Sequence, residues 1–169
     1  MDVELIFPAI EHKQAAWDYR QEHIDLGEAW VHGSGGLIRA EDYESWLEKI
    51  TTARTDPQDG WVKCSTYLAF AENKIVGMIQ IRHELNDDLL KHGGHIGYGV
   101  RPSERRKGYA TQMLALALEK CRELGIEKAL VTCDRDNIGS AGTIRKNGGV
   151  LENEITEENG NILQRYWIQ

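Results

Sequence analysis

The segment that most constrains the fold is GVRPSERRKGYAT, residues 99–111. It joins an apolar run to a basic turn, to Gly108 and to a helix start built from small residues. Four basic residues fall within seven positions, namely Arg101, Arg105, Arg106 and Lys107. The first N–H groups of a helix lack internal partners, and the helix dipole makes them partially positive. Strand, basic turn, glycine and helix in this order predict a site for a discrete anion such as a phosphate.

The residue types in this turn suit that ligand. Gly108 permits a backbone approach that a Cβ atom would obstruct, and Ala110 keeps the next surface small. Thr111 adds a hydroxyl, and the basic side chains can neutralise further phosphate charge. Two common phosphate motifs are absent, because no G-x-G-x-x-G opens this helix and no G-K-[ST] ends the turn.

The rest of the chain predicts one domain over residues 1–169. We expect an α/β (α+β) fold with a mixed, mostly antiparallel central sheet of six to seven strands and about four helices. Strands are expected at 3–6, 65–71, 75–85, 95–100, 128–133, 150–155 and 162–168, and helices at 11–30, 43–50, 110–124 and 138–144. Residues 31–39, with three glycines, predict a flexible connection. The two glycines inside 95–100 predict a bulge or a close backbone approach.

Composition and charge exclude several classes of protein. Hydrophobic residues make up 41% and charged residues 28%, which is typical of a globular protein, and no apolar run reaches the ~20 residues of a membrane span. The net charge of −7 argues against nucleic acid and membrane partners. The N-terminal residues lack a secretory leader, and three cysteines predict reduced, mostly buried thiols, so we expect a cytoplasmic protein. His92 and His95 lack partners at metal-ligand spacing, so no metal is expected.

A family resemblance follows from a motif in its context. Residues Arg105–Ala110 match [Q/R]-x-x-G-x-[G/A], directly after IGYGVRP and at the start of an amphipathic helix. A strand, DRDN and a helix ending in IRKNGG come next. Over residues ~65–150 the chain resembles the GNAT superfamily of N-acetyltransferases by this criterion.

The resemblance implies a binding site for acetyl-CoA. Its pyrophosphate would lie on the turn, held by main-chain amides and by Thr111, and its pantetheine arm would pair with the strand around Tyr98. Asn137 matches the family asparagine that faces the pantetheine, and Ser140 lies one turn further on. The implied contacts are Tyr98, Gly99, Val100, Arg105, Arg106, Lys107, Gly108, Tyr109, Ala110, Thr111, Asn137 and Ser140.

The resemblance also implies the reaction, which is direct attack by a primary amine of a small molecule or peptide in a ternary complex. The oxyanion donor would be a backbone N–H near Val100. The family tyrosine that serves as acid is replaced by Ile144, so Tyr98 becomes the candidate acid. His95 and Glu84 are the candidate bases, because a histidine or carboxylate there can accept the proton of an ammonium group.

Other interpretations of the same residues stay open. The missing tyrosine keeps a CoA-binding regulatory or interaction module without transferase activity in consideration. An RNA-binding domain predicts salt-sensitive RNA affinity and no CoA binding. The sequence leaves the acceptor amine unidentified and the oligomeric state open, a homodimer through an exposed final strand included.

Overall fold

The computed structural model describes residues 2–169. Within them lie seven strands and four α-helices, in the order that the sequence predicts. The strands are β1 (Glu4–Ile6), β2 (Cys64–Ala71), β3 (Lys74–Arg82), β4 (Ile96–Val100), β5 (Ala129–Asp134), β6 (Val150–Thr156) and β7 (Ile162–Ile168). The helices are α1 (Lys13–Asp25), α2 (Tyr43–Thr52), α3 (Tyr109–Glu123) and α4 (Ile138–Lys146). The predicted α/β class is confirmed.

The strands form two antiparallel sheets rather than one continuous sheet. The first has the order β1-β2-β3-β4 and the second the order β5-β7-β6. The final strand therefore lies between two neighbours, and most of its residues are buried. The expectation that it offers an exposed edge is wrong, because the hairpin after β6 turns β7 inward and leaves β6 outermost.

The two sheets meet where β4 and β5 begin. The His95 N–H donates to the Leu130 carbonyl at 2.7 Å, and the Leu130 N–H donates to His95 Nδ1 at 2.9 Å. Helix α3 carries the chain from the end of β4 back to the start of β5. Beyond this junction no ladder joins β4 to β5 among the described residues, so the facing edge of β4 has no strand partner.

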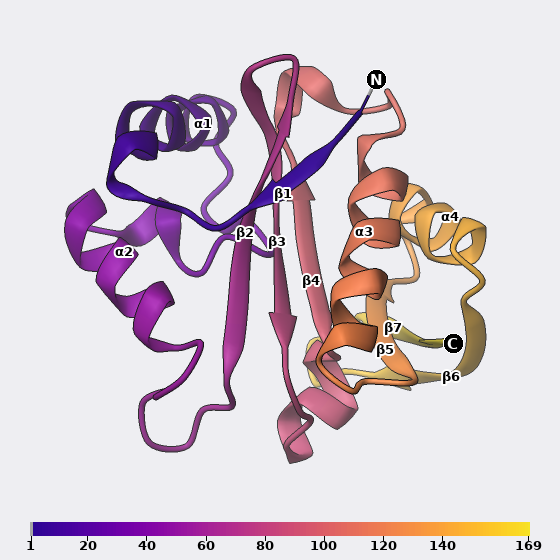
Figure 1. The fold of residues 1–169 in the computed structure, drawn as a ribbon. Coiled ribbons are helices and arrows are strands. Elements are labelled where there is room, and N and C mark those ends of the chain that lie inside the picture. Colours follow the sequence, from indigo (N-terminus) through magenta and orange to yellow (C-terminus); the bar gives the residue numbers. More distant parts are fainter. Residues whose placement is uncertain (1) are drawn as a thin grey trace.

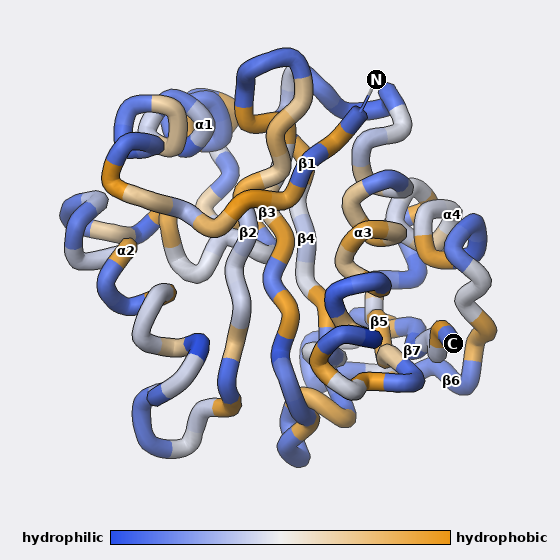
Figure 2. The backbone as a smooth tube through the Cα atoms, viewed as in Figure 1, coloured by the Kyte–Doolittle hydropathy of each residue, from blue (hydrophilic) through white to orange (hydrophobic). Residues whose placement is uncertain are grey.

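Helices cover both faces of the first sheet (Figure 1). Helices α1 and α2 lie on one side and α3 on the other, with α4 beyond it. Hydrophobic residues line the strands, while the loops at the sheet ends are mostly hydrophilic (Figure 2). Each fully buried large apolar side chain contributes about 1.5–3 kcal/mol. Prominent members of the two cores are Tyr19, Leu37, Tyr43 and Trp46 under α1 and α2, and Ile79, Met113, Leu114, Ile144 and Tyr166 around α3.

Residues 31–36 are packed against β4, which makes the expectation of a flexible connection wrong. Gly33 has a φ of +76°, and a Cβ atom there would lie 2.5 Å from the Gly97 carbonyl oxygen. The Trp46 indole N–H donates to the Ser34 carbonyl at 3.0 Å and fixes the same segment to α2. The glycines in this segment thus permit close main-chain contact with the strand.

The glycines inside β4 also permit close packing of neighbouring groups against the strand. Strand β4 pairs with β3 without a register shift, so no bulge is present. A Cβ atom at Gly97 would lie 3.1 Å from the Arg82 guanidinium, and one at Gly99 would lie 3.0 Å from the His32 carbonyl oxygen. Of the two expected alternatives, close approach is confirmed.

Two local expectations differ from the structure. Helix α1 ends at Asp25 rather than near residue 30, because Gly27 adopts a φ of +81° that breaks the helix. A π-helical turn at Leu89–Gly93 follows β3 and was not predicted. Within residues 2–169, no helix has the length and apolar character needed to cross a bilayer.

Candidate functional site

The turn between β4 and α3 leaves a helix N-terminus open. Gly108 is the N-cap of α3 with a φ of 86°, and no side chain caps this end. The first intrahelical bond runs from the Gln112 N–H to the Gly108 carbonyl at 3.3 Å, so the N–H groups of Ala110 and Thr111 precede it. Arg106 also has a positive φ, 62°. Backbone in this conformation directs successive N–H groups toward one point, where an anion binds.

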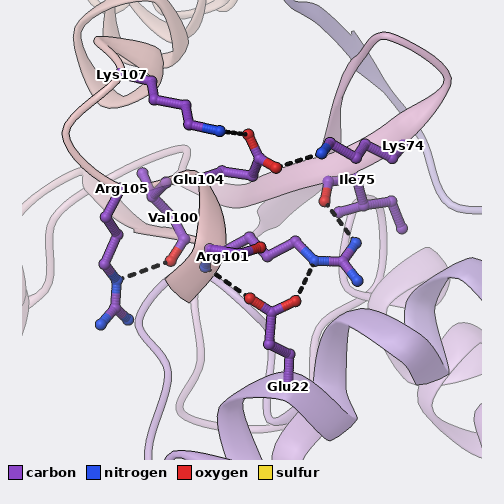
Figure 3. A network of polar contacts seen from close by, with 9 residues as sticks. Glu22, Lys74, Ile75, Val100, Arg101, Glu104, Arg105 and Lys107 are labelled. Carbon is purple, nitrogen blue, oxygen red and sulfur yellow. Dashed lines mark hydrogen bonds and ion pairs between the residues drawn. The ribbon is translucent and has the colours of Figure 1, made fainter.

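Most basic side chains of the turn are already paired with carboxylates. The Arg101 guanidinium donates to Glu22 at 2.6 Å and to the Ile75 carbonyl at 3.1 Å (Figure 3). The Ser103 N–H donates to the other Glu22 oxygen at 2.6 Å. These bonds outweigh the desolvation of the carboxylate, which alone raises its pKa, and lower the Glu22 pKa to about 2. Glu22 of α1 therefore holds the start of the turn.

The second half of the turn is held in the same way. The Glu104 carboxylate is buried and accepts from both Lys74 and Lys107, the latter at 3.0 Å (Figure 3). Arg105 pairs with Glu28 at 2.8 Å and donates to the Val100 carbonyl at 3.2 Å. These side chains fix the shape of the turn, and the backbone N–H groups become its main means of binding an anion.

Arg106 differs from the other basic residues of the turn. Its side chain is exposed, and it forms no ion pair with a carboxylate among the described residues. It is the basic side chain of the motif with its charge available to a ligand.

The free edge of β4 presents main-chain groups next to this turn. The Arg82 N–H donates to the His95 carbonyl, and the Arg101 N–H donates to the Val76 carbonyl, so the odd-numbered residues of this strand face β3. By the alternation of an antiparallel ladder, the N–H and C=O of Tyr98 and the N–H of Val100 face the unpaired edge.

Tyr98 and Ser140, both predicted site residues, lie together where β4 and β5 separate. The Tyr98 hydroxyl is 2.6 Å from Ser140 Oγ. Burial raises the Tyr98 pKa to about 12, so the phenol is protonated at neutral pH. Asn137 Oδ1 accepts from the Ser140 N–H at 3.0 Å and caps α4. Cys133 is close to Ser140, and burial raises its pKa to about 11. This arrangement offers proton donors at neutral pH.

The two predicted bases lie elsewhere. The buried His95 ring accepts from the Leu130 N–H at Nδ1, which places the proton of the neutral ring on Nε2. Burial and then Arg82 lower its pKa to about 4. Glu84 is exposed two residues beyond β3, and no hydrogen bond joins it to His95 or Tyr98. Both assignments stay predictions, and the structure gives His95 a clear structural role.

Among the described residues, the cysteines and the metal-ligating residue types form no further site. Cys64, Cys121 and Cys133 are free and buried, as predicted. Within residues 2–169, no group of three or more His, Cys, Asp or Glu side chains is arranged to hold a metal ion.

Sequence reasoning missed the acidic partners of the turn. Glu22 and Glu28 lie 79 and 77 residues before the arginines they bind, with no spacing that links them. Glu104 and Lys107 form an i,i+3 pair, which is a signal that the sequence does carry.

Comparison with known proteins places this geometry in a family. The model of the acetyltransferase (GNAT) family matches residues 36–148. None of the curated proteins matches the sequence.

Solved structures share the fold at low sequence identity. The microcin C7 self-immunity acetyltransferase MccE, in complex with acetyl-CoA and AMP, superposes with a TM-score of 0.69 at 18% identity, covering 98% of this chain and 91% of its own. RimL, the ribosomal L7/L12 α-N-protein acetyltransferase bound to CoA, gives 0.68 at 20%, covering 98% and 92%. A chimera of spermidine N-acetyltransferase SpeG from Vibrio cholerae and hSSAT gives 0.65 at 16%, covering 99% and 96%. The chain belongs to the GNAT family of acetyltransferases.

Proposed function

We propose that this protein transfers the acetyl group of acetyl-CoA to a primary amine of a small molecule or peptide, by direct attack in a ternary complex. One observation carries the proposal. The unpaired edge of β4 runs between an open helix N-terminus at Gly108 and a protonated Tyr98–Ser140 pair. A thioester extended along this edge has its phosphates at one end and its sulfur at the other.

The donor's phosphates would bind the N–H groups around Arg106–Ala110, with the Thr111 hydroxyl and the unpaired Arg106 as further contacts. Lys107 and Arg105 would contribute by holding the shape of the turn and not by contacting the phosphates, since they already bind Glu104 and Glu28. The pantetheine amides would pair with the Tyr98 N–H and C=O, as an added strand does. Asn137 would contribute through Nδ2, because its Oδ1 caps α4.

The chemical step needs a hydrogen-bond donor for the oxyanion and a proton donor for the leaving thiolate. The nitrogen lone pair of a neutral amine attacks the thioester carbon, and the oxyanion that forms accepts a hydrogen bond from a main-chain N–H on the free edge of β4. The C–S bond then breaks, and the thiolate receives a proton from the Tyr98–Ser140 pair. A thiol of ordinary pKa, about 8.5, is a good leaving group, so this modest acid is sufficient in place of the missing tyrosine.

The acceptor amine can be narrowed to two classes for testing. RimL is named for a ribosomal protein and SpeG for spermidine, so amines of a peptide and of a polyamine are the acceptors to test first. The formal charge of −7 favours a cationic acceptor.

We also place the enzyme in the cytoplasm, since its three cysteines are free thiols. A homodimer stays a prediction, and its interface would involve the exposed strand β6 rather than β7.

The test is incubation of the protein with radiolabelled acetyl-CoA and a panel of amines: a peptide with N-terminal serine, spermidine and a mixed amine library. We expect transfer of label to at least one acceptor. Tight CoA binding with no transfer to any amine would identify a binding module instead. Absence of CoA binding together with salt-sensitive RNA affinity would reverse the assignment altogether.

A further inference from the structure

His32 lies on the face of β4 opposite the Tyr98 side chain. The Tyr98 ring packs with the core around α3, whereas on the other face Gly99 lies against His32 and Gly97 lies against the Arg82 guanidinium. The His32 carbonyl oxygen would be 3.0 Å from a Cβ atom at Gly99, so this backbone rests directly on the strand. Because both glycines lack side chains, nothing from β4 itself covers the strand on this face.

The His32 side chain is exposed and is oriented by its neighbours. It contacts the Trp30 indole edge-on, with 6.4 Å between ring centroids, and the Arg39 guanidinium lies over that indole at 5.6 Å. The charged groups that act on the imidazole are Arg82 at the end of β3 and Asp134 at the end of β5. One belongs to each sheet, so the imidazole is within electrostatic reach of both.

We infer that His32 is the base that removes the proton from the acceptor ammonium group. This rests on the proposed function. An amine that reaches the free edge of β4 from the side of residues 31–36 meets His32, while the leaving sulfur faces the Tyr98–Ser140 pair on the other side. Base and acid then act on different atoms, His32 on the attacking nitrogen and the Tyr98–Ser140 pair on the leaving sulfur.

The proton balance closes without any further reactant. The acceptor ammonium loses two protons on becoming an amide. His32 takes the first, which frees the lone pair, and then passes it to water. The second leaves the nitrogen of the tetrahedral intermediate and replaces the proton that the Tyr98–Ser140 pair gives to the thiolate. Burial and Arg82 lower the His32 pKa while Asp134 raises it, and the net direction is below the ordinary value of 6.5. The ring is therefore neutral at pH 7 and ready to accept a proton. His95 differs, since its Nδ1 is occupied by the Leu130 N–H.

The experiment compares wild type, His32→Gln and the control His92→Gln, a partly exposed histidine in the turn after β3. With the best acceptor among the serine peptide and spermidine, we expect His32→Gln to lower kcat/KM about 100-fold or more and to abolish the rise of kcat/KM with pH below 6.5. With a weakly basic aryl amine, already neutral at pH 7, the loss should be about tenfold or less. His92→Gln should match wild type within about twofold.

Two measurements separate this inference from the proposed function. Asp134→Asn removes the group that raises the His32 pKa, so the acid limb of kcat/KM should move to lower pH. Affinity for CoA should be the same in wild type and His32→Gln. If wild type acetylates an amine and His32→Gln keeps its rate and pH profile, the inference is overturned and the function stands. If wild type acetylates no amine, the proposed function itself fails.

Discussion

Helices α3 and α4 both begin just after a strand, at β4 and at β5, yet they begin in opposite ways. Gly108 opens α3 with a left-handed backbone and no capping side chain. Asn137 opens α4 with its Oδ1 bound to the Ser140 N–H. The first start leaves its N–H groups and dipole for a ligand, and the second satisfies its own.

The two helix starts therefore suit different functions. The open start of α3 suits a charged group that arrives with the donor. The capped start of α4 holds Ser140 at 2.6 Å from the Tyr98 hydroxyl, where a fixed position matters more than charge. Changes at the first start should therefore alter binding, and changes at the second should alter turnover or stability.

The largest effect is expected from Gly108→Asp. A carboxylate there would occupy and repel the anion site, so we expect CoA affinity to fall more than about 100-fold, or about 2.7 kcal/mol, in calorimetric titration. Gly108→Ala is the matched variant that adds a Cβ atom without a charge, and it should lower CoA affinity less than Gly108→Asp. It meets no atom within 4 Å and costs only about 1–2 kcal/mol of backbone strain. Wild-type affinity in Gly108→Asp would show that the phosphates bind elsewhere.

Tyr98→Phe and Ser140→Ala should each lower kcat about 10–100-fold, because each breaks the pair that supplies the proton. The double variant should be no worse than the poorer single one, since the two hydroxyls act together. The dissociation constant for CoA should change by a few-fold at most. Tyr67→Phe, on β2, is the control and should be neutral. Additive losses in the double variant would contradict a shared role.

Glu22→Gln tests what holds the open turn in shape. It weakens the bonds to Arg101 and the Ser103 N–H, and we expect a loss of about 1–2 kcal/mol in urea unfolding at pH 7. The pKa of Glu22 is lowered in the folded state, so its stabilisation is full above about 4.5 and is lost as pH falls toward about 2. The gap to wild type should shrink over that interval. Glu11→Gln, a 77% exposed control, should show no such gap.

Asn137→Ala should have the smallest effect, about 1 kcal/mol from loss of the cap. For a chain of this size that lowers Tm by about 2–4 °C in thermal unfolding. Asn137→Asp keeps a capping oxygen and should restore Tm. An unchanged Tm in Asn137→Ala would mean that α4 does not depend on its cap.

The sequence was informative wherever a signal is local. Met113, Leu114 and Ala117 recur at helical spacing and predict α3, and Gly108 marks its start. The order of strands and helices along the chain follows from short apolar runs between turn residues, and the structure confirms it. The two sheets could not be separated, because no local pattern says which strand edges stay unpaired.

Contacts between distant segments account for the rest. Residues 31–36 look flexible from their glycines, but Gly33 fits against Gly97, more than sixty positions away. A glycine-rich segment can be a loose linker or can make a tight backbone contact. Which of the two forms depends on whether another segment packs against it. The contact of His32 with Gly99 is hidden in the sequence for the same reason.

The pair of hydrogen bonds between His95 and Leu130 has a mechanical consequence. It joins the two sheets at the start of β4, whereas further along β4 no strand pairs with the facing edge among the described residues. The spacing of the two sheets along the rest of β4 therefore depends on this junction. Loss of this junction would change the spacing of the two sheets even if the other residues of the candidate site were unchanged.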